Sequence, residues 1–89
     1  MKWVITSVSG TDDMIQSNDG KGTGNHPIDR ADELPYKFKL FDDDGELYYE
    51  GKSNDRNSEA AFEPLDWATH YAGCTEIQYQ QDNGNWETL

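Results

Sequence analysis

Asp66, His70 and Cys74 carry reactive side chains and follow one another at intervals of four residues. On a continuous helix this spacing would place all three on one face. A cysteine next to a histidine and an aspartate is the pattern of a nucleophilic enzyme. Gly73, however, is expected to end the helix before Cys74, and a cysteine that opens a strand is more often a small buried apolar residue. We therefore predict no catalytic residues and no enzyme activity.

Three aspartates and a glycine at 42–45 offer the hard oxygen ligands that calcium and magnesium prefer. An EF-hand loop needs alternating acids before its glycine and a glutamate six positions after it. Here the first ligand position would be Leu40 and the last would be Gly51. A zinc site on Asp66, His70 and Cys74 would need a fourth ligand, and only His26 offers an obvious nitrogen. We predict a β-turn at 42–45, and neither a metal nor another cofactor.

Glycine is concentrated at 20–24, as in phosphate-binding loops. The Walker pattern places four residues between its first glycine and a Gly-Lys-Ser/Thr run, between a strand and a helix. Neither the spacing nor the context is met here. The polar composition instead predicts a flexible loop over about 17–34.

The strongest compositional feature is charge. The chain has a net charge of −11, and residues 40–89 contain twelve acids against only Lys52 and Arg56, a net of 2 − 12 = −10. Such a field repels nucleic acid and anionic membranes and attracts basic surfaces. If most of these acids share one side, their density approaches that of duplex DNA, about one charge per 1.7 Å. We therefore predict a partner with a basic protein surface, in the sharpest version a nucleic-acid-binding protein.

Aromatic residues are interleaved with the acids. Because side chains alternate along a strand, Leu47 and Tyr49 are expected to point inward and Tyr48 outward. An exposed tyrosine among carboxylates is typical of interface hot spots. The predicted partner-binding residues are Asp42, Asp43, Asp44, Glu46, Tyr48, Glu50, Glu59 and Glu63.

Two hairpins and one helix account for most of the sequence pattern. Residues 3–8 are β-branched and aromatic and predict a first strand, with a weaker pairing segment at 14–16. Apolar residues alternate with lysines at 36–40, followed by the turn at 42–45 and a return strand ending at 50. A second hairpin comprises 75–80 and 86–89 around a turn at 82–85.

Residues 57–72 are the best helix candidate. Asn57 or Ser58 can cap a first turn, and Pro64 is tolerated only near a helix start. The pattern predicts either a short turn followed by a helix over 64–72 or one helix distorted at Pro64. Gly73 supplies the stop.

Together these elements predict an α+β fold: one domain over 1–89, with an antiparallel sheet of four to five strands and one α-helix packed on a face. A single cysteine excludes an intrachain disulfide. No apolar run approaches the ~20 residues of a membrane span, and the first apolar run is too short for a signal peptide. A cytoplasmic location is the expectation.

The predicted function is that of a non-enzymatic acidic protein-binding module. In length and charge the chain resembles the small acidic inhibitors of phages and mobile elements, such as anti-restriction and anti-CRISPR proteins. That resemblance would imply an inhibitor that mimics nucleic acid, although no motif accompanies it. The alternatives are a small structural or accessory domain without a dedicated site, and a small metal-dependent or His/Asp-based enzyme.

Overall fold

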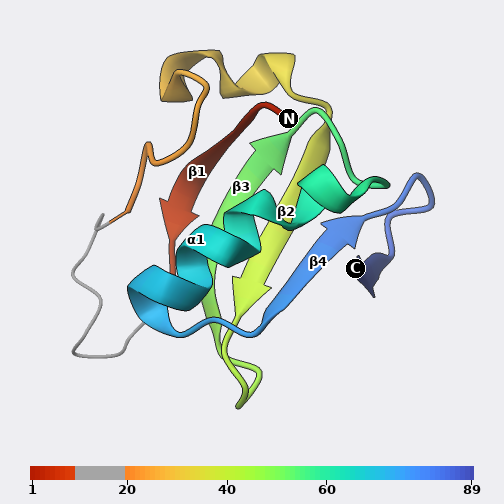
Figure 1. Cartoon of the computed structure of the whole chain (residues 1–89). Coiled ribbons are helices and arrows are strands. Elements are labelled where there is room, and N and C mark those ends of the chain that lie inside the picture. The colour runs from red at the N-terminus through yellow and green to blue at the C-terminus, as the bar shows by residue number, and fades with distance from the viewer. Residues whose placement is uncertain (10–19) are drawn as a thin grey trace.

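Five strands form one antiparallel sheet in the order β1-β3-β2-β4-β5 (Figure 1). The computed structural model describes residues 1–9 and 20–89, so the pairing segment predicted at 14–16 and the start of the predicted loop lie outside it. The α+β fold predicted from the sequence is confirmed. The strands are β1 (Trp3–Val8), β2 (Tyr36–Phe41), β3 (Leu47–Ser53), β4 (Glu76–Gln80) and β5 (Trp86–Thr88).

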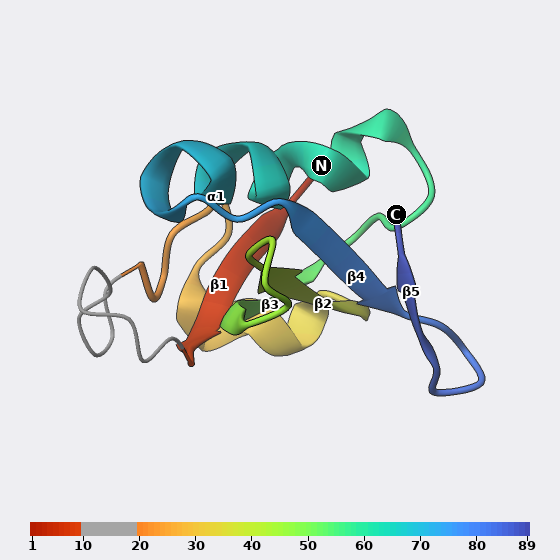
Figure 2. The same cartoon turned by 90° about the horizontal axis from the view of Figure 1, so that it is seen from below.

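One face of the sheet is covered by a helix layer, in which the 3₁₀-helix η2 (Glu59–Phe62) runs directly into α1 (Glu63–Ala72) (Figure 2). The Ser58 hydroxyl caps this layer by accepting a hydrogen bond from the Ala60 N–H. Pro64 lies in the first turn of α1, and Gly73 ends the helix in the left-handed conformation that favours glycine. Of the two predicted alternatives, the structure has the short helical turn followed by a helix, with no residue between η2 and α1 and with α1 beginning one residue before Pro64. Over 1–9 and 20–89, no helix has the length and apolar character needed to cross a membrane.

The hydrophobic core fills the space between the sheet and the helix layer. Alternation along β2 and β4 directs apolar side chains to this face, as predicted. The buried Tyr79 hydroxyl donates a hydrogen bond of 2.8 Å to the Ala61 carbonyl, which joins β4 to η2. The core cluster comprises Trp3, Ile5, Phe38, Leu40, Tyr48, Tyr49, Ala61, Ala68, Cys74, Ile77 and Tyr79.

Both predicted hairpin turns are present, and both have the same construction. In the first, the N–H of Asp42 donates to the Glu46 carbonyl and the N–H of Gly45 donates to the Asp42 carbonyl. The second repeats these hydrogen bonds at the equivalent positions of 81–85. Each is a three-residue loop closed by a glycine at positive φ, +81° at Gly45 and +87° at Gly84.

A β-bulge changes the direction of one predicted site residue. Leu40 is paired with Tyr49 and Phe41 with Leu47, so Tyr48 is the extra residue on β3. A bulge interrupts the alternation of side chains, and Tyr48 is only 6% exposed and packs in the core cluster. The prediction that Tyr48 is an exposed aromatic residue is therefore wrong.

The segment 20–34 runs from the helix side of the sheet, where Gly20 lies against Trp67 and Tyr49, along the edge of β1 to the other face (Figure 2). It contains the 3₁₀-helix η1 (Ile28–Glu33), which lies on the side opposite α1 (Figure 2). Residues 22–25 exchange backbone hydrogen bonds with β1, including Ile5 N–H to the Thr23 carbonyl at 2.8 Å. This pairing covers the outer edge of β1, which would otherwise be open to other strands. Neither η1 nor this pairing was predicted from the sequence.

Candidate functional site

The predicted partner-binding acids lie in three separate places. Glu50 projects from the sheet face opposite the helix layer, where lysines surround it. Glu59 and Glu63 belong to the helix layer on the other side. The remaining four acids, Asp42, Asp43, Asp44 and Glu46, occupy the tip of the β2–β3 hairpin. The fold therefore does not gather the predicted set into one patch.

Asp42 has a structural task in the hairpin turn. Its carboxylate accepts hydrogen bonds of 2.9 Å from the backbone N–H groups of both Asp44 and Glu46. The hydrogen bond from Glu46, with further ones from Tyr48 and the turn backbone, lowers the pKa of Asp42. Carboxylate oxygens of Asp42, Asp43 and Asp44 lie within 4.8 Å of one another. The two backbone hydrogen bonds of Asp42 account for the place of this aspartate in the turn.

The Asp66, His70 and Cys74 series does not converge on a site. Asp66 and His70 are exposed on α1, whereas Cys74 is completely buried in the core. Burial, with a smaller effect of the Asp42 charge, raises the pKa of the Cys74 thiol to about 12. A thiol with this pKa stays protonated at neutral pH and is a poor nucleophile. The expectation that Cys74 is a small buried apolar residue is confirmed.

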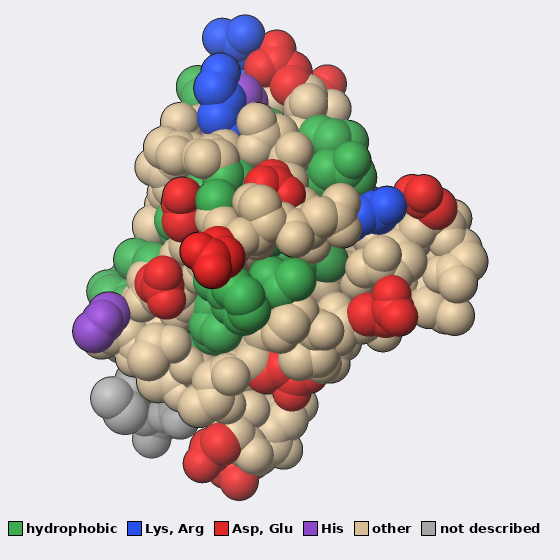
Figure 3. Space-filling model, turned by 45° about the vertical axis from the view of Figure 1, so that its right-hand side comes forward, with side chains coloured by type: hydrophobic (Ala, Val, Ile, Leu, Met, Phe, Trp, Pro, Cys, Tyr) green, Lys and Arg blue, Asp and Glu red, His purple; other side chains and the backbone are tan. Residues whose placement is uncertain are grey.

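The outer side of the helix layer combines acids with exposed aromatic rings. Phe62 and Tyr71 are 37% and 49% exposed and, with Ile28, are the large exposed hydrophobic residues of the described chain. From residue 57 to residue 89 the sequence has no lysine or arginine. In Figure 3, hydrophobic side chains gather on this side of the molecule with acidic side chains around them. We call this the acidic helix surface: Glu59, Phe62, Glu63, Asp66 and Tyr71.

A stack of aromatic rings holds Tyr71 in place. Its ring lies parallel to that of Trp67, with a centroid distance of 5.1 Å and an interplanar angle of 19°. The Trp67 ring in turn lies 5.0 Å from that of the buried Tyr49. Because the exposed ring is already ordered by the core, little side-chain entropy is lost when a partner covers it.

Hydrogen bonds to Asp55 fix the N-terminal end of η2, where the acidic helix surface begins. Asp55 accepts hydrogen bonds from the backbone N–H groups of Asn57 and Ser58 and from the Ser58 hydroxyl. These hydrogen bonds, that of the hydroxyl first, lower the pKa of Asp55. Asp55 therefore positions η2, a role that the Asp-x-x-Ser spacing is able to signal but that was not assigned from the sequence.

Sequence reasoning also missed Phe62 and Tyr71 as surface residues. Neither was among the predicted partner-binding residues. Comparisons with models of known protein families, with curated proteins and with solved structures find no match for this chain.

Proposed function

We propose that this chain is a non-enzymatic protein-binding module whose acidic helix surface engages a basic protein surface. The observation that carries the proposal is the exposure of Phe62 and Tyr71 on a helix layer that also has three acids, in a stretch of sequence without lysine or arginine. One of these acids, Glu63, has a carboxylate oxygen 3.8 Å from the N-terminal ammonium group. Aromatic anchors supply most of the binding energy in many interfaces. Surrounding charges contribute orientation and association rate.

The hairpin tip is a weaker candidate than the acidic helix surface. Asp43, Asp44 and Glu46 are exposed there, but no large exposed hydrophobic residue of the described chain belongs to the tip. An acidic tip without an aromatic anchor steers a partner without holding it firmly. We therefore assign the contact to the helix layer and the long-range attraction to all the acids together.

Mimicry of nucleic acid is the sharper form of the proposal. An α-helix rises about 1.5 Å and a 3₁₀-helix about 2.0 Å per residue, so Glu63 and Asp66 lie about 4.5 Å apart along the axis and Glu59 and Glu63 about 6–8 Å apart. The phosphates of one DNA strand are about 3.4 Å apart. The helix acids alone are thus sparser than a phosphate backbone. Mimicry of nucleic acid therefore requires that acids elsewhere in the chain contribute to the same contact.

Charge-matched variants test the proposal. The first combines Glu59→Gln, Glu63→Gln and Asp66→Asn, and the second combines Asp43→Asn, Asp44→Asn and Glu46→Gln. Each removes three charges, so the two variants keep the same net charge. We expect a basic protein captured from the native cell extract to be lost with the helix variant and retained with the tip variant. Equal loss with both would reduce the interaction to net charge and contradict the proposed surface.

A third variant separates anchoring from charge. Tyr71→Ser leaves the net charge unchanged and should weaken capture at least tenfold, as expected for a hot-spot tyrosine worth about 2 kcal/mol. Adding a DNA duplex to the captured complex then tests the sharper form. Release by the duplex supports mimicry, whereas a complex that survives excess duplex limits the function to protein binding.

A further inference from the structure

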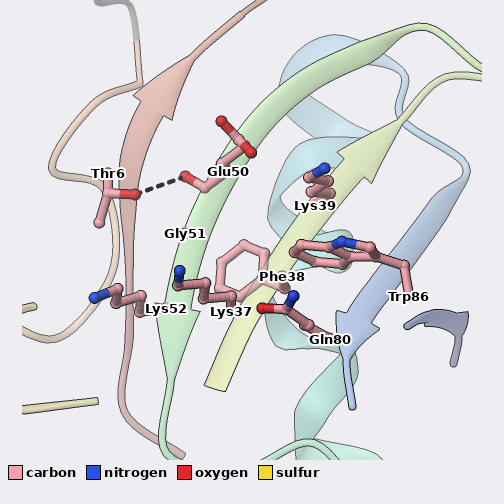
Figure 4. Close-up of a pocket in the computed structure, with 9 residues that line it drawn as sticks. All are labelled: Thr6, Lys37, Phe38, Lys39, Glu50, Gly51, Lys52, Gln80 and Trp86. Carbon is pink, nitrogen blue, oxygen red and sulfur yellow. Dashed lines mark hydrogen bonds between the residues drawn. The ribbon is translucent and has the colours of Figure 1, made fainter. Parts of the chain in front are cut away.

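The sheet face opposite the helix layer carries a hollow of about 300 Å³ with a cationic side and an aromatic side. It lies over β2 and β3, and its wall on the β5 side is the Trp86 ring (Figure 4). Lys37 and Lys52 extend toward β1, away from Trp86. The hollow has no residue in common with the acidic helix surface, so an inference about it is independent of the proposed function.

Two lysines of the hollow lie directly opposite each other. The register of β2 and β3 pairs Lys37 with Lys52, and like charges in such cross-strand positions destabilise a sheet. Over the described residues, neither ammonium group has a carboxylate within 4.0 Å. In a chain with 18 acidic and 7 basic residues, ample carboxylates were available to neutralise them. An anion bound between the two ammonium groups would reduce their mutual repulsion.

The aromatic side has a different character. Trp86 is half-buried and is paired with Gln80 on β4. The Lys39 ammonium lies 4.3 Å from the centroid of the Trp86 ring, which holds the indole over the sheet. Lys39 is also paired with Glu50, the carboxylate that lines the hollow. Lys39 therefore faces a carboxylate across the strands, whereas Lys37 and Lys52 face each other.

We propose that this hollow binds a small phosphate monoester with a planar ring, the phosphate between Lys37 and Lys52 and the ring against Trp86. Lysine is a common phosphate ligand, and the face of the Trp86 ring opposite the Lys39 ammonium suits a planar group. The volume is at the lower end of the ~300–1,000 Å³ range of small-molecule sites. Charges at the surface are screened over about 8 Å at physiological salt, so the charges of the lining itself dominate: Lys37, Lys39 and Lys52 against Glu50, a net of 3 − 1 = +2.

Adenosine monophosphate is a suitable probe because it has both parts. Titrated at millimolar concentration into the isotope-labelled full chain, it should shift the Trp86 indole N–H resonance and the backbone resonances of Lys37 and Lys52. Adenosine and ribose 5-phosphate each contain one of the two parts and should bind at least tenfold more weakly. Shifts scattered over the surface, or none at Trp86, would overturn the proposal.

Lysine variants identify the anion site. Lys37→Gln and Lys52→Gln should each weaken binding about tenfold, as expected when a hydrogen bond to a charged group is lost. Lys21→Gln changes the net charge by the same amount at an exposed position outside the hollow and should leave the affinity unchanged. Equal weakening by Lys21→Gln would show that only net charge matters and would refute the site.

The same variants give a second readout, without ligand. If Lys37 and Lys52 repel each other, Lys37→Gln should have a higher melting temperature than Lys21→Gln. A lower melting temperature would show that Lys37 is held by a stabilising contact within the chain. That result would contradict the repulsion between Lys37 and Lys52 on which the proposed anion site depends.

Discussion

A methyl group at position 51 should destabilise the fold, because Gly51 leaves no room for one. A Cβ atom there would lie 2.3 Å from Phe38 Cζ and 2.5 Å from the carbonyl oxygen of Val4. Phe38 is completely buried, and Val4 contributes backbone of the neighbouring strand β1. Neither neighbour can yield without disturbing the core or the sheet.

Two effects of Gly51→Ala on the free energy of unfolding have opposite signs. Replacing glycine by alanine at an unstrained position stabilises a protein by about 0.4–1 kcal/mol, through the unfolded chain. Overpacking a core costs about 1–3 kcal/mol. For Gly51→Ala we therefore expect a net loss of about 1.5 kcal/mol, or roughly 6–12 °C in melting temperature for a domain of this size.

Urea unfolding of a double-mutant cycle provides the assay. Phe38→Leu removes ring atoms that the new methyl group would meet, so the double variant should be more stable than the sum of the single effects by about 0.5 kcal/mol or more. Gly45→Ala is the control, since its Cβ would meet nothing within 4 Å and should show no coupling to Phe38→Leu. A Gly51→Ala protein as stable as the parent, or strict additivity with Phe38→Leu, would refute the clash.

Three further predictions concern buried or capping groups. Tyr79→Phe should lower the free energy of unfolding in urea by about 1–2 kcal/mol, because the Ala61 carbonyl loses the buried hydrogen bond that the Tyr79 hydroxyl donates. Burial raises the Cys74 pKa to about 12 from 9.0, so above pH 9 the unfolded state loses this proton first. Stability should then fall by up to about 1.4 kcal/mol per pH unit, and unfolding curves of Cys74→Ala measured between about pH 8 and pH 10 should lack this slope. Ser58→Ala should cost about 1 kcal/mol through loss of the η2 cap, seen as a lower urea midpoint.

Local signals in the sequence determined most of the secondary structure. The helix ends at Gly73 because a left-handed residue is needed there, and it begins near Pro64 because proline suits only a first turn. The two hairpin turns follow from Gly45 and Gly84 for the same conformational reason. Alternation of apolar and polar residues placed β2 and β4 correctly, since side chains of a strand point to opposite faces. These features depend on residues that are close in sequence, so they can be predicted without the tertiary structure.

Tertiary structure alone decided which side chains meet. Tyr48 became a core residue because a bulge adds one residue to β3, and a bulge arises from the pairing of two strands rather than from either one. Lys37 is opposite Lys52 because of the register between β2 and β3, and Glu50 and Glu59 lie on opposite sides of the sheet because the helix layer covers only one face. Composition sets the total charge of this chain, but a sum over residues has no direction, so the separation of an acidic helix surface from a lysine-lined hollow required the folded chain.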